Sequence, residues 1–317
     1  MNRHLALGLG AILAAASIGT FVLWDVRGDA VDDPANARCN SPVVSYTKST
    51  RFPDRKEIGV HFTCVGADLA GVLTVPPGAG PYPAAVWVHG SGEAGRLTYA
   101  GAPLVRAFVD RGIAVLSYDK RGVGESGGEC CPGDDGHFNL LAADAAGALE
   151  ALAARPDIDM SRVGFIGASQ AGWVVPLAVS RVHLPVAFVA LVDAPVVSYG
   201  EEQLYSQLTG EEGDQPSDLP RSAILQQVRD AGPSGFDPTA ALREMHSPGL
   251  WLYGGNDRSQ PTAEDRQALA QLRAAGHEFR IIVFTGADHG LLDIPPSDPR
   301  ALPIFVRWVH QTVNTTR

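Results

Sequence analysis

From residue 84 onward the chain alternates short apolar runs with segments of helical pattern, and no other feature constrains its fold as strongly. Short, uninterrupted apolar runs are typical of strands that are buried on both faces of a sheet. Strands that are separated by helices form a parallel sheet covered by those helices. The expected strands are residues 84–88, 113–118, 163–166, 186–192, 249–253 and 280–284, and the expected helices are residues 102–111, 140–154, 171–181, 262–275 and 302–312. The sequence therefore predicts an α/β fold with a mostly parallel central sheet flanked by helices.

Two segments depart from this alternation. Residues 56–63 and 67–75 are strand-like runs on either side of a glycine-containing turn, which predicts an antiparallel hairpin ahead of the parallel strands. Residues 195–245 separate two expected core strands, and they are acidic in the middle and rich in glycine, proline and glutamine. Helical pieces are expected at residues 199–208 and 220–230. We therefore expect one α/β domain over residues 31–317, with a small helical cap inserted at about residues 195–245.

Residues 5–24 form an uncharged, largely apolar stretch. Its length of about 20 residues is enough for a helix to span a bilayer and is long for the apolar region of a cleaved signal peptide. Arg3 and His4 precede the stretch and Asp25 follows it, and this charge order predicts that the rest of the chain lies outside the cytoplasm. We expect residues 1–30 to be a signal anchor or a signal peptide, with membrane attachment through residues 5–24 in the first case. The expected location is the periplasm or the cell envelope.

Four cysteines, an even number, fit an oxidising compartment and predict disulfides. We expect a Cys39–Cys64 bond, since it would fasten the N-terminal extension to the first hairpin. A bond between the adjacent Cys130 and Cys131 would close a strained ring. The sequence is equally consistent with free thiols at these two residues and with bonds from them to other cysteines.

Charge and residue spacing exclude two kinds of site. The formal net charge of −10 comes without a cluster of lysine and arginine residues, which excludes a surface for nucleic acid. No C-x-x-C pair or cluster of histidine and cysteine has the spacing of a zinc site.

Residues 119–126 (DKRGVGES) carry charges and glycines but lack the spacing of a phosphate-binding loop. We expect them to form a turn that is fastened by an Asp119/Arg121 pair.

The run GASQAG at residues 167–172 follows the expected strand 163–166 and leads into the expected helix 171–181. A serine at a sharp strand-to-helix turn, flanked by small residues, presents its hydroxyl at the edge of the sheet. Ser169 is therefore a candidate nucleophile. The usual pattern is G-x-S-x-G, and Ala171 stands where the last glycine is expected. Because alanine is the smallest replacement for glycine, we expect the turn to survive with a slight shift.

A serine hydroxyl needs a base to take its proton, and we expect a histidine whose ring is oriented by a carboxylate. Such groups lie just beyond the carboxyl ends of parallel strands. Asp257 follows the expected strand 249–253, and His289 follows the expected strand 280–284. The order serine, aspartate, histidine along the chain is the order of one large class of hydrolases. Asp193, at the end of an earlier strand, is the alternative acid.

Acyl transfer also needs N–H donors for the negatively charged oxygen of the intermediate. The residue after the nucleophile supplies the first donor, which is the backbone N–H of Gln170. The second donor should come from the loop HGSG at residues 89–92, which follows the first buried strand. Ser91 is the expected donor, with Gly92 as the alternative.

Taken together, these segments resemble the α/β-hydrolase superfamily. The matching motifs are HGSG at 89–92, DKRGVG at 119–124, GASQAG at 167–172, GND at 255–257 and GADHG at 286–290. The resemblance spans about residues 56–315 and is strongest to bacterial exported esterases and serine-peptidase-like hydrolases. It implies an α/β-hydrolase fold with Ser169 as nucleophile, His289 as general base and Asp257 as the orienting acid. Gln170 and Ser91 would form the oxyanion hole.

The resemblance implies a serine hydrolase that cleaves carboxylic esters of small molecules through a covalent acyl-enzyme. The same triad serves thioesters and small peptides, so a thioesterase or a small-peptide hydrolase is an alternative. A protein of this fold that binds a ligand or partner without catalysis is a second alternative, although such proteins usually lack a member of the triad. The mechanism requires no metal or organic cofactor.

Overall fold

The computed structural model describes residues 36–315, apart from residues 40, 97–100, 212 and 214. The predicted signal anchor or signal peptide, residues 1–30, lies outside the described residues. Within the described part of the chain, no helix combines the length and the apolar character needed to cross a membrane.

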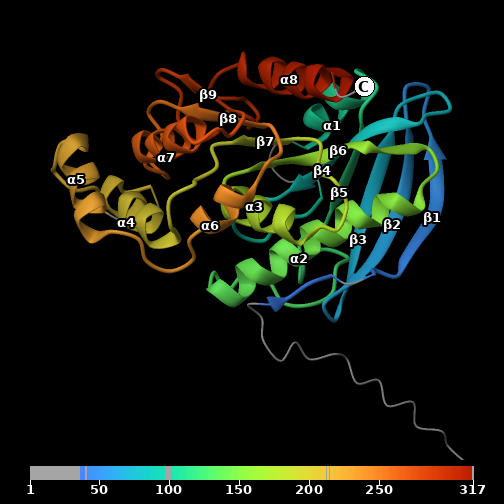
Figure 1. Cartoon of the computed structure of the whole chain (residues 1–317), viewed down its shortest axis with the longest axis horizontal. Coiled ribbons are helices and arrows are strands. Elements are labelled where there is room, and N and C mark those ends of the chain that lie inside the picture. Colours follow the sequence, from blue (N-terminus) through green and yellow to red (C-terminus); the bar gives the residue numbers. More distant parts are fainter. Residues whose placement is uncertain (1–35, 40, 97–100, 212, 214, 316–317) are drawn as a thin grey trace, which may run out of the picture.

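The described residues form one nine-stranded sheet with the strand order β1-β2-β3-β5-β4-β6-β7-β8-β9 (Figure 1). The strands are β1 (Val44–Arg51), β2 (Lys56–Cys64), β3 (Ala67–Val75), β4 (Tyr82–Val88), β5 (Ala114–Tyr118), β6 (Ile158–Ala168), β7 (Val189–Val192), β8 (Gly249–Gly254) and β9 (Phe279–Phe284). The strands from β5 to β9 in this order are parallel, whereas β1, β2 and β3 form an antiparallel extension that joins the sheet through β5. These pairings confirm the predicted α/β class, with its mostly parallel sheet and its N-terminal hairpin.

β1 is a strand that the sequence does not predict. Its residues are mostly polar, and the structure leaves most of them exposed at the open edge of the sheet. A strand with little buried surface lacks the regular apolar spacing from which strands are recognised. β2 and β3, by contrast, follow the prediction. Val65 and Gly66 close their two-residue turn with positive φ angles of 44° and 70°, as tight hairpin turns require.

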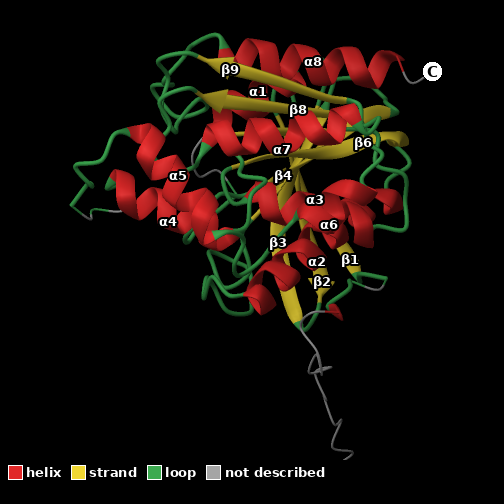
Figure 2. Cartoon of the chain, turned by 60° about the vertical axis from the view of Figure 1, so that its left-hand side comes forward, coloured by secondary structure: helices red, strands yellow, loops and turns green. Residues whose placement is uncertain are grey.

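Helices cover both faces of the sheet (Figure 2). The helices of the α/β part are α1 (Gly101–Val109), α2 (Asp135–Ala151), α3 (Ala171–Arg181), α7 (Thr262–Ala274) and α8 (Ala301–Thr315), with a 3₁₀ turn at Leu152–Ala154. Side chains of α2, α3 and α7 belong to one apolar core, and those of α1 and α8 belong to the other. Within β4, Val86 faces the first core and Trp87 the second. Because successive residues of a strand face opposite sides, both must be apolar, which explains the continuous apolar runs.

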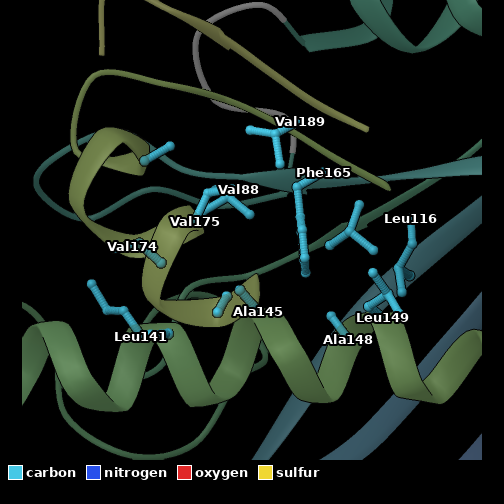
Figure 3. Packing of buried hydrophobic residues seen from close by; sticks show 14 of the residues in the cluster. Val88, Leu116, Leu141, Ala145, Ala148, Leu149, Phe165, Val174, Val175 and Val189 are labelled. Carbon is cyan, nitrogen blue, oxygen red and sulfur yellow. The ribbon is translucent and has the colours of Figure 1, made fainter. Parts of the chain in front are cut away.

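Small residues let α2 approach the sheet closely. Figure 3 shows Ala145 and Ala148 of α2 on the side of the helix that faces the strands, where the ring of Phe165 from β6 fills the space between them. All three side chains are fully buried. The helix begins at Asp134, whose carboxylate accepts the backbone N–H of His137 at 2.7 Å and so caps the first turn.

The segment between β7 and β8 contains α4 (Tyr199–Thr209), α5 (Arg221–Ala231) and α6 (Thr239–Glu244). α4 begins at a capping box formed by Ser198 and Glu201, and it ends at Gly210, whose φ angle of 73° stops the helix. α4 and α5, here named the cap helices, pack on each other through a small apolar cluster of their own. The buried members of that cluster are Tyr205, Ile224 and Val228.

The predicted Cys39–Cys64 disulfide is wrong, since both residues are buried free thiols. The two side chains nevertheless lie close together. A Cβ on Gly147 of α2 would approach Cys39 Sγ to 2.5 Å and Cys64 Sγ to 3.4 Å. The disulfide joins Cys130 and Cys131 instead. The sequence reveals only the spacing of the cysteines, whereas a bond depends on the distance and orientation of the two side chains in the fold.

Candidate active site

Ser169 lies at the turn between β6 and α3. Its φ angle is 52°, a left-handed conformation that is uncommon for a residue with a side chain. The turn is fixed on both sides: Ser169 N–H donates to Val192 O at 3.0 Å, and Ser169 O accepts from Gly172 N–H at 2.9 Å. Such backbone strain persists only where the surrounding structure holds it, and it is concentrated at functional sites. The Ser169 side chain lines a cavity at this edge of the sheet.

Close packing explains why Ala171 fits where the motif usually has glycine. A Cβ on Gly167 would lie 2.5 Å from Cβ of Ala171 and 2.9 Å from Val88 O, which leaves no room for a side chain at residue 167. A Cβ on Gly172 would lie 2.1 Å from Pro195 O. The close approaches of this turn therefore fall on the two glycines, and the fully buried Ala171 fills the space opposite Gly167.

The structure brings together the three residues singled out in the sequence. His289 Nε2 lies 3.2 Å from Ser169 Oγ, and His289 Nδ1 lies 2.8 Å from Asp257 Oδ2. These residues follow β6, β8 and β9, whose carboxyl ends meet at one edge of the parallel sheet. Asp257 is fully buried, and its Oδ1 accepts the backbone N–H groups of Ser259 at 2.8 Å and Gln260 at 3.2 Å. The carboxylate is thus held in one orientation while its other oxygen meets the imidazole.

Two opposing effects act on the His289 ring. Burial lowers its pKa, but the hydrogen bond to Asp257 and the negative charges around the ring outweigh burial and raise the pKa to about 9. Asp257 supplies the largest part of that increase, with Asp193 and Glu202 adding to it. A carboxylate beside an imidazole stabilises the protonated ring, which is the form that a general base reaches during proton transfer.

Asp193, the alternative acid, has a different set of partners. It directly follows β7 with a φ angle of 45°, and burial raises its pKa to about 7. Its Oδ1 accepts Gly254 N–H at 3.0 Å, and its Oδ2 accepts the backbone N–H groups of Gly290 at 3.1 Å and Leu291 at 3.0 Å. Asp193 therefore joins the end of β8 to the loop after β9, while the imidazole bonds to Asp257.

The cap helices bind the loop that carries Asp257. The hydroxyl of Tyr205 in α4 donates to Asp257 O at 3.0 Å. Arg221 of α5 donates to the same oxygen at 2.8 Å and to Gly255 O at 2.9 Å. The cap thus fixes the backbone of Asp257, while the N–H groups of Ser259 and Gln260 fix its carboxylate.

A cavity of about 240 Å³ opens beside Ser169 and His289. Its walls come from the sheet edge, from the loops and from α4, and they include Trp87, Ser91, Val192, Glu202, Gln203 and Leu292. Of the two predicted oxyanion donors, Ser91 lies in this wall, and Gln170 starts α3 directly after Ser169. The first N–H groups of a helix point along the positive end of its dipole, which favours a negative charge there.

The predicted Asp119/Arg121 pair is wrong. Asp119 binds Arg96, with Oδ1 3.0 Å from Arg96 Nε and 2.7 Å from the Arg96 backbone nitrogen. Arg121 forms a buried pair with Asp144 of α2, with nitrogen–oxygen distances of 2.7 and 2.6 Å. Both partners are 23 residues away along the chain, so local spacing could not reveal them.

The residue between these two, Lys120, is one that sequence reasoning missed. It is 1% exposed, and its ammonium group donates to Gly90 O at 2.6 Å, Gly92 O at 2.8 Å and Gln170 Oε1 at 3.0 Å. The available signal was its position just past a buried strand, which is also the position of Asp257 relative to β8.

The chain resembles known proteins over most of its length. It is 27% identical over 245 residues to esterase EstD of Thermotoga maritima, a match that covers 70% of this chain and 57% of that protein. The chain thus spans a little over half the length of this relative. It is also 27% identical over 295 residues to an uncharacterized protein of Mycobacterium tuberculosis, covering 91% of this chain and 90% of that protein. Acetyl xylan esterase 1 of Thermoanaerobacterium sp. JW/SL YS485 has the same fold, with a TM-score of 0.62 at 17% identity over 86% of this chain and 89% of that one. These matches confirm the α/β-hydrolase fold.

The sequence profile of the prolyl oligopeptidase family matches residues 104–316. The matched segment runs from α1 to the end of α8 and contains Ser169, Asp257 and His289. It covers more than half of the chain, and the antiparallel extension of the sheet lies ahead of it. The protein therefore belongs to the prolyl oligopeptidase family.

Proposed function

We propose that the protein is a serine hydrolase that cleaves carboxylic esters through a covalent acyl-enzyme. The observation that carries this proposal is the continuous hydrogen-bonded series Ser169 Oγ, His289 and Asp257 beside a cavity. A nucleophile that contacts a base, with the base oriented by a third group, is the arrangement that acyl transfer requires.

Each proton in the reaction has a defined path. His289 Nε2 takes the proton of Ser169 as Oγ bonds to the ester carbonyl carbon, and the carbonyl oxygen becomes negatively charged. The backbone N–H groups of Gln170 and Ser91 stabilise that oxygen. His289 then passes its proton to the leaving alkoxide as the carbon–oxygen bond breaks, which frees an alcohol. A water molecule, deprotonated by His289, then attacks the acyl carbon. The bond from that carbon to Ser169 Oγ breaks as His289 returns the proton to Oγ, and the carboxylic acid leaves.

The cavity supports a small acyl substrate. Its volume of about 240 Å³ lies below the range of roughly 300–1,000 Å³ found for sites that bury drug-sized ligands. Esters of short acids fit such a space more readily than long fatty esters. The resemblance to esterase EstD and to an acetyl xylan esterase points to the same bond type.

Membership of the prolyl oligopeptidase family favours one second candidate, hydrolysis of small peptides by the same residues. A thioesterase would use them too. The leaving group separates these three activities, because an amide nitrogen must receive its proton from His289 before it can depart, whereas a thiolate need not. A protein that only binds a ligand in this cavity is less well supported, since such a protein has no need of the Ser169–His289 contact.

The decisive experiment compares p-nitrophenyl esters of increasing acyl length with aminoacyl p-nitroanilides and an acyl thioester, using wild-type protein and Ser169→Ala. We expect the highest kcat/KM for short esters and no turnover by the variant. A fluorophosphonate should label Ser169, and mass spectrometry of the labelled peptide locates the adduct. Turnover retained by Ser169→Ala, or a label on another residue, would overturn the assignment. Higher kcat/KM for the anilides would identify a peptidase.

We also infer from the sequence that the enzyme acts outside the cytoplasm, on the strength of residues 5–24 and their flanking charges. Residues 1–30 fused to alkaline phosphatase should give phosphatase activity in intact bacteria, whereas the phosphatase without them should not. Recovery of the full-length protein in the membrane fraction would identify an anchor, and recovery of a shortened soluble chain would identify a cleaved signal peptide.

A further inference from the structure

We propose that Lys120 is a positioning residue of the oxyanion hole, where its buried cation orders and polarises the backbone that contacts the negatively charged oxygen. The proposal rests on the acyl-transfer function above and adds a residue to it. Lys120 does not line the cavity. Its influence passes through Gly90, Gly92 and Gln170, whose oxygens accept its hydrogen bonds.

The three contacts of Lys120 use the whole ammonium group. A lysine ammonium has three N–H donors and no acceptor, and here each proton has an oxygen within 3.0 Å. Two of these oxygens belong to the loop after β4, and the third belongs to the side chain at the start of α3. One cation therefore joins the two segments of the chain that carry the expected oxyanion donors.

The Gly90 contact bears directly on the expected donor at Ser91. The carbonyl of Gly90 and the N–H of Ser91 belong to the same peptide group, because a peptide bond joins the C=O of one residue to the N–H of the next. A hydrogen bond to the oxygen of a peptide group makes its N–H a stronger donor. A cationic donor has a larger effect than a neutral one. Lys120 thereby makes the N–H of Ser91 a stronger hydrogen-bond donor.

The charge of Lys120 is not neutralised by an acid. Among the described residues Lys120 forms no ion pair, and its two neighbours in the sequence are paired elsewhere, Asp119 with Arg96 and Arg121 with Asp144. Burial lowers the pKa of Lys120 to about 8. A buried ammonium that bonds only to neutral oxygens is costly for the fold, so a role in packing alone would be served better by an apolar side chain of similar length. The uncompensated cation instead favours the negative charge that develops on the substrate oxygen, through the oxyanion segments to which it bonds.

The test is Lys120→Met, which keeps the length of the side chain and removes its charge and its donors. We expect kcat for a short aryl ester to fall about 10- to 100-fold with KM changed less than about twofold, a loss below the roughly 100- to 1,000-fold caused by removing a direct oxyanion donor. The matched control is Ser126→Ala, in the same segment after β5. Its buried hydroxyl bonds to Asp119 O at 2.7 Å and to Ala70 N at 3.0 Å, away from the oxyanion loop. This control should lower Tm while leaving kcat within about twofold of wild type, since neither of the two hydrogen bonds that it removes involves the oxyanion loop.

A second readout separates an electrostatic role from a merely structural one. A trifluoromethyl ketone bonds through its carbonyl carbon to Ser169 Oγ, passes the serine proton to His289 and leaves a negative charge on the former carbonyl oxygen. The matching trifluoromethyl carbinol has no carbonyl and binds without that charge. We expect Lys120→Met to weaken the ketone by the same factor as kcat and to leave the carbinol affinity unchanged.

Two results would overturn the proposal. One is a Lys120→Met enzyme with wild-type kcat and ketone affinity, and the other is an equal loss of affinity for ketone and carbinol. If Lys120→Met does not fold, Lys120→Gln, which retains N–H donors without the charge, must show the same selective loss of ketone affinity. A wild-type protein that neither hydrolyses esters nor labels at Ser169 would instead refute the proposed function, so the two failures are distinguishable.

Discussion

The carboxylate of Asp193 accepts the backbone N–H of Gly290 at 3.1 Å, so this acid holds the residue next to His289 rather than the imidazole itself. Its other oxygen accepts Gly254 N–H at 3.0 Å, in the strand that precedes Asp257. The two buried acids of the site therefore have different partners, the imidazole for Asp257 and backbone N–H groups for Asp193. Asp257 orients the ring, and Asp193 keeps the histidine loop against the acid loop.

This division predicts different outcomes for the same chemical change. Asp257→Asn should lower kcat for a short aryl ester by about 10⁴-fold, because an amide favours the wrong tautomer of the imidazole. Asp193→Asn should lower kcat much less but should reduce the free energy of unfolding by about 1–3 kcal/mol, because one amide cannot accept all of these backbone N–H groups. Steady-state kinetics and urea unfolding of both variants check the prediction. The opposite ranking of kcat would exchange the roles of the two acids.

Ester hydrolysis should depend on the titration of His289. The ring must be neutral to accept the proton of Ser169, and its pKa is raised to about 9. The rate is therefore lost as pH falls through about 9 and the ring becomes charged. We expect kcat/KM for a neutral ester to increase above pH 7 as His289 loses its proton, and to stop rising once Lys120, whose pKa is lowered to about 8, loses its charge. The rate of spontaneous hydrolysis is subtracted at each pH. A profile that is already flat at pH 7 would contradict the raised pKa.

The turn at Ser169 should tolerate a change at Ala171 and not at Gly167. A methyl group on Gly167 would meet Ala171 Cβ at 2.5 Å and Val88 O at 2.9 Å, so Gly167→Ala should abolish activity and destabilise the fold by about 1–3 kcal/mol or more. Ala171→Gly removes the methyl group that occupies this contact and should cost about 1 kcal/mol through helix propensity alone. Fluorophosphonate labelling of Ser169 in each variant, together with its Tm, gives the measurement. Labelling of Gly167→Ala at the wild-type rate would show that the turn can adjust.

The buried pair of Arg121 and Asp144 should contribute more to folding than an exposed pair. Its side chains are 5% and 0% exposed, so Asp144→Ala leaves a buried guanidinium without its partner and should cost about 3–5 kcal/mol. Asp298→Ala is the control, because its partner Arg300 is 68% exposed and such pairs contribute about 0–1 kcal/mol. Chemical unfolding of the two variants provides the comparison. A similar loss of unfolding free energy in both variants would mean that Arg121 becomes exposed to water when Asp144 is removed.

The sequence predicted the parallel half of this fold well because burial on both faces leaves a continuous apolar run. The run at residues 249–253 corresponds to β8, and that at 280–284 corresponds to β9, within one residue at each end. The same principle placed Asp257 and His289, since side chains that follow adjacent parallel strands meet at one edge. β1 was missed for the converse reason, because its residues 44–51 are largely exposed and carry no such pattern.

Side-chain pairing was predicted less successfully than strand position. Asp119 and Arg121 are close in the sequence, yet each has a partner from another element, and the relative positions of those elements depend on the tertiary fold. Lys120 was overlooked for a related reason. An isolated lysine in a turn is usually solvated, and only the packing of the loop after β4 against the start of α3 makes it a buried cation.

The hydrogen bonds from the cap helices to the loop that carries Asp257 limit how the cap can be altered. Tyr205 of α4 and Arg221 of α5 donate to the backbone oxygen of Asp257, and α4 also lines the cavity. The helix that lines the cavity therefore also supports the loop that carries Asp257. If the cap were exchanged for that of another protein, the new cap would have to supply two donors to Asp257 O to keep the acid in place. A change of substrate specificity should therefore come from single substitutions in the cavity wall that leave Tyr205 and Arg221 unchanged.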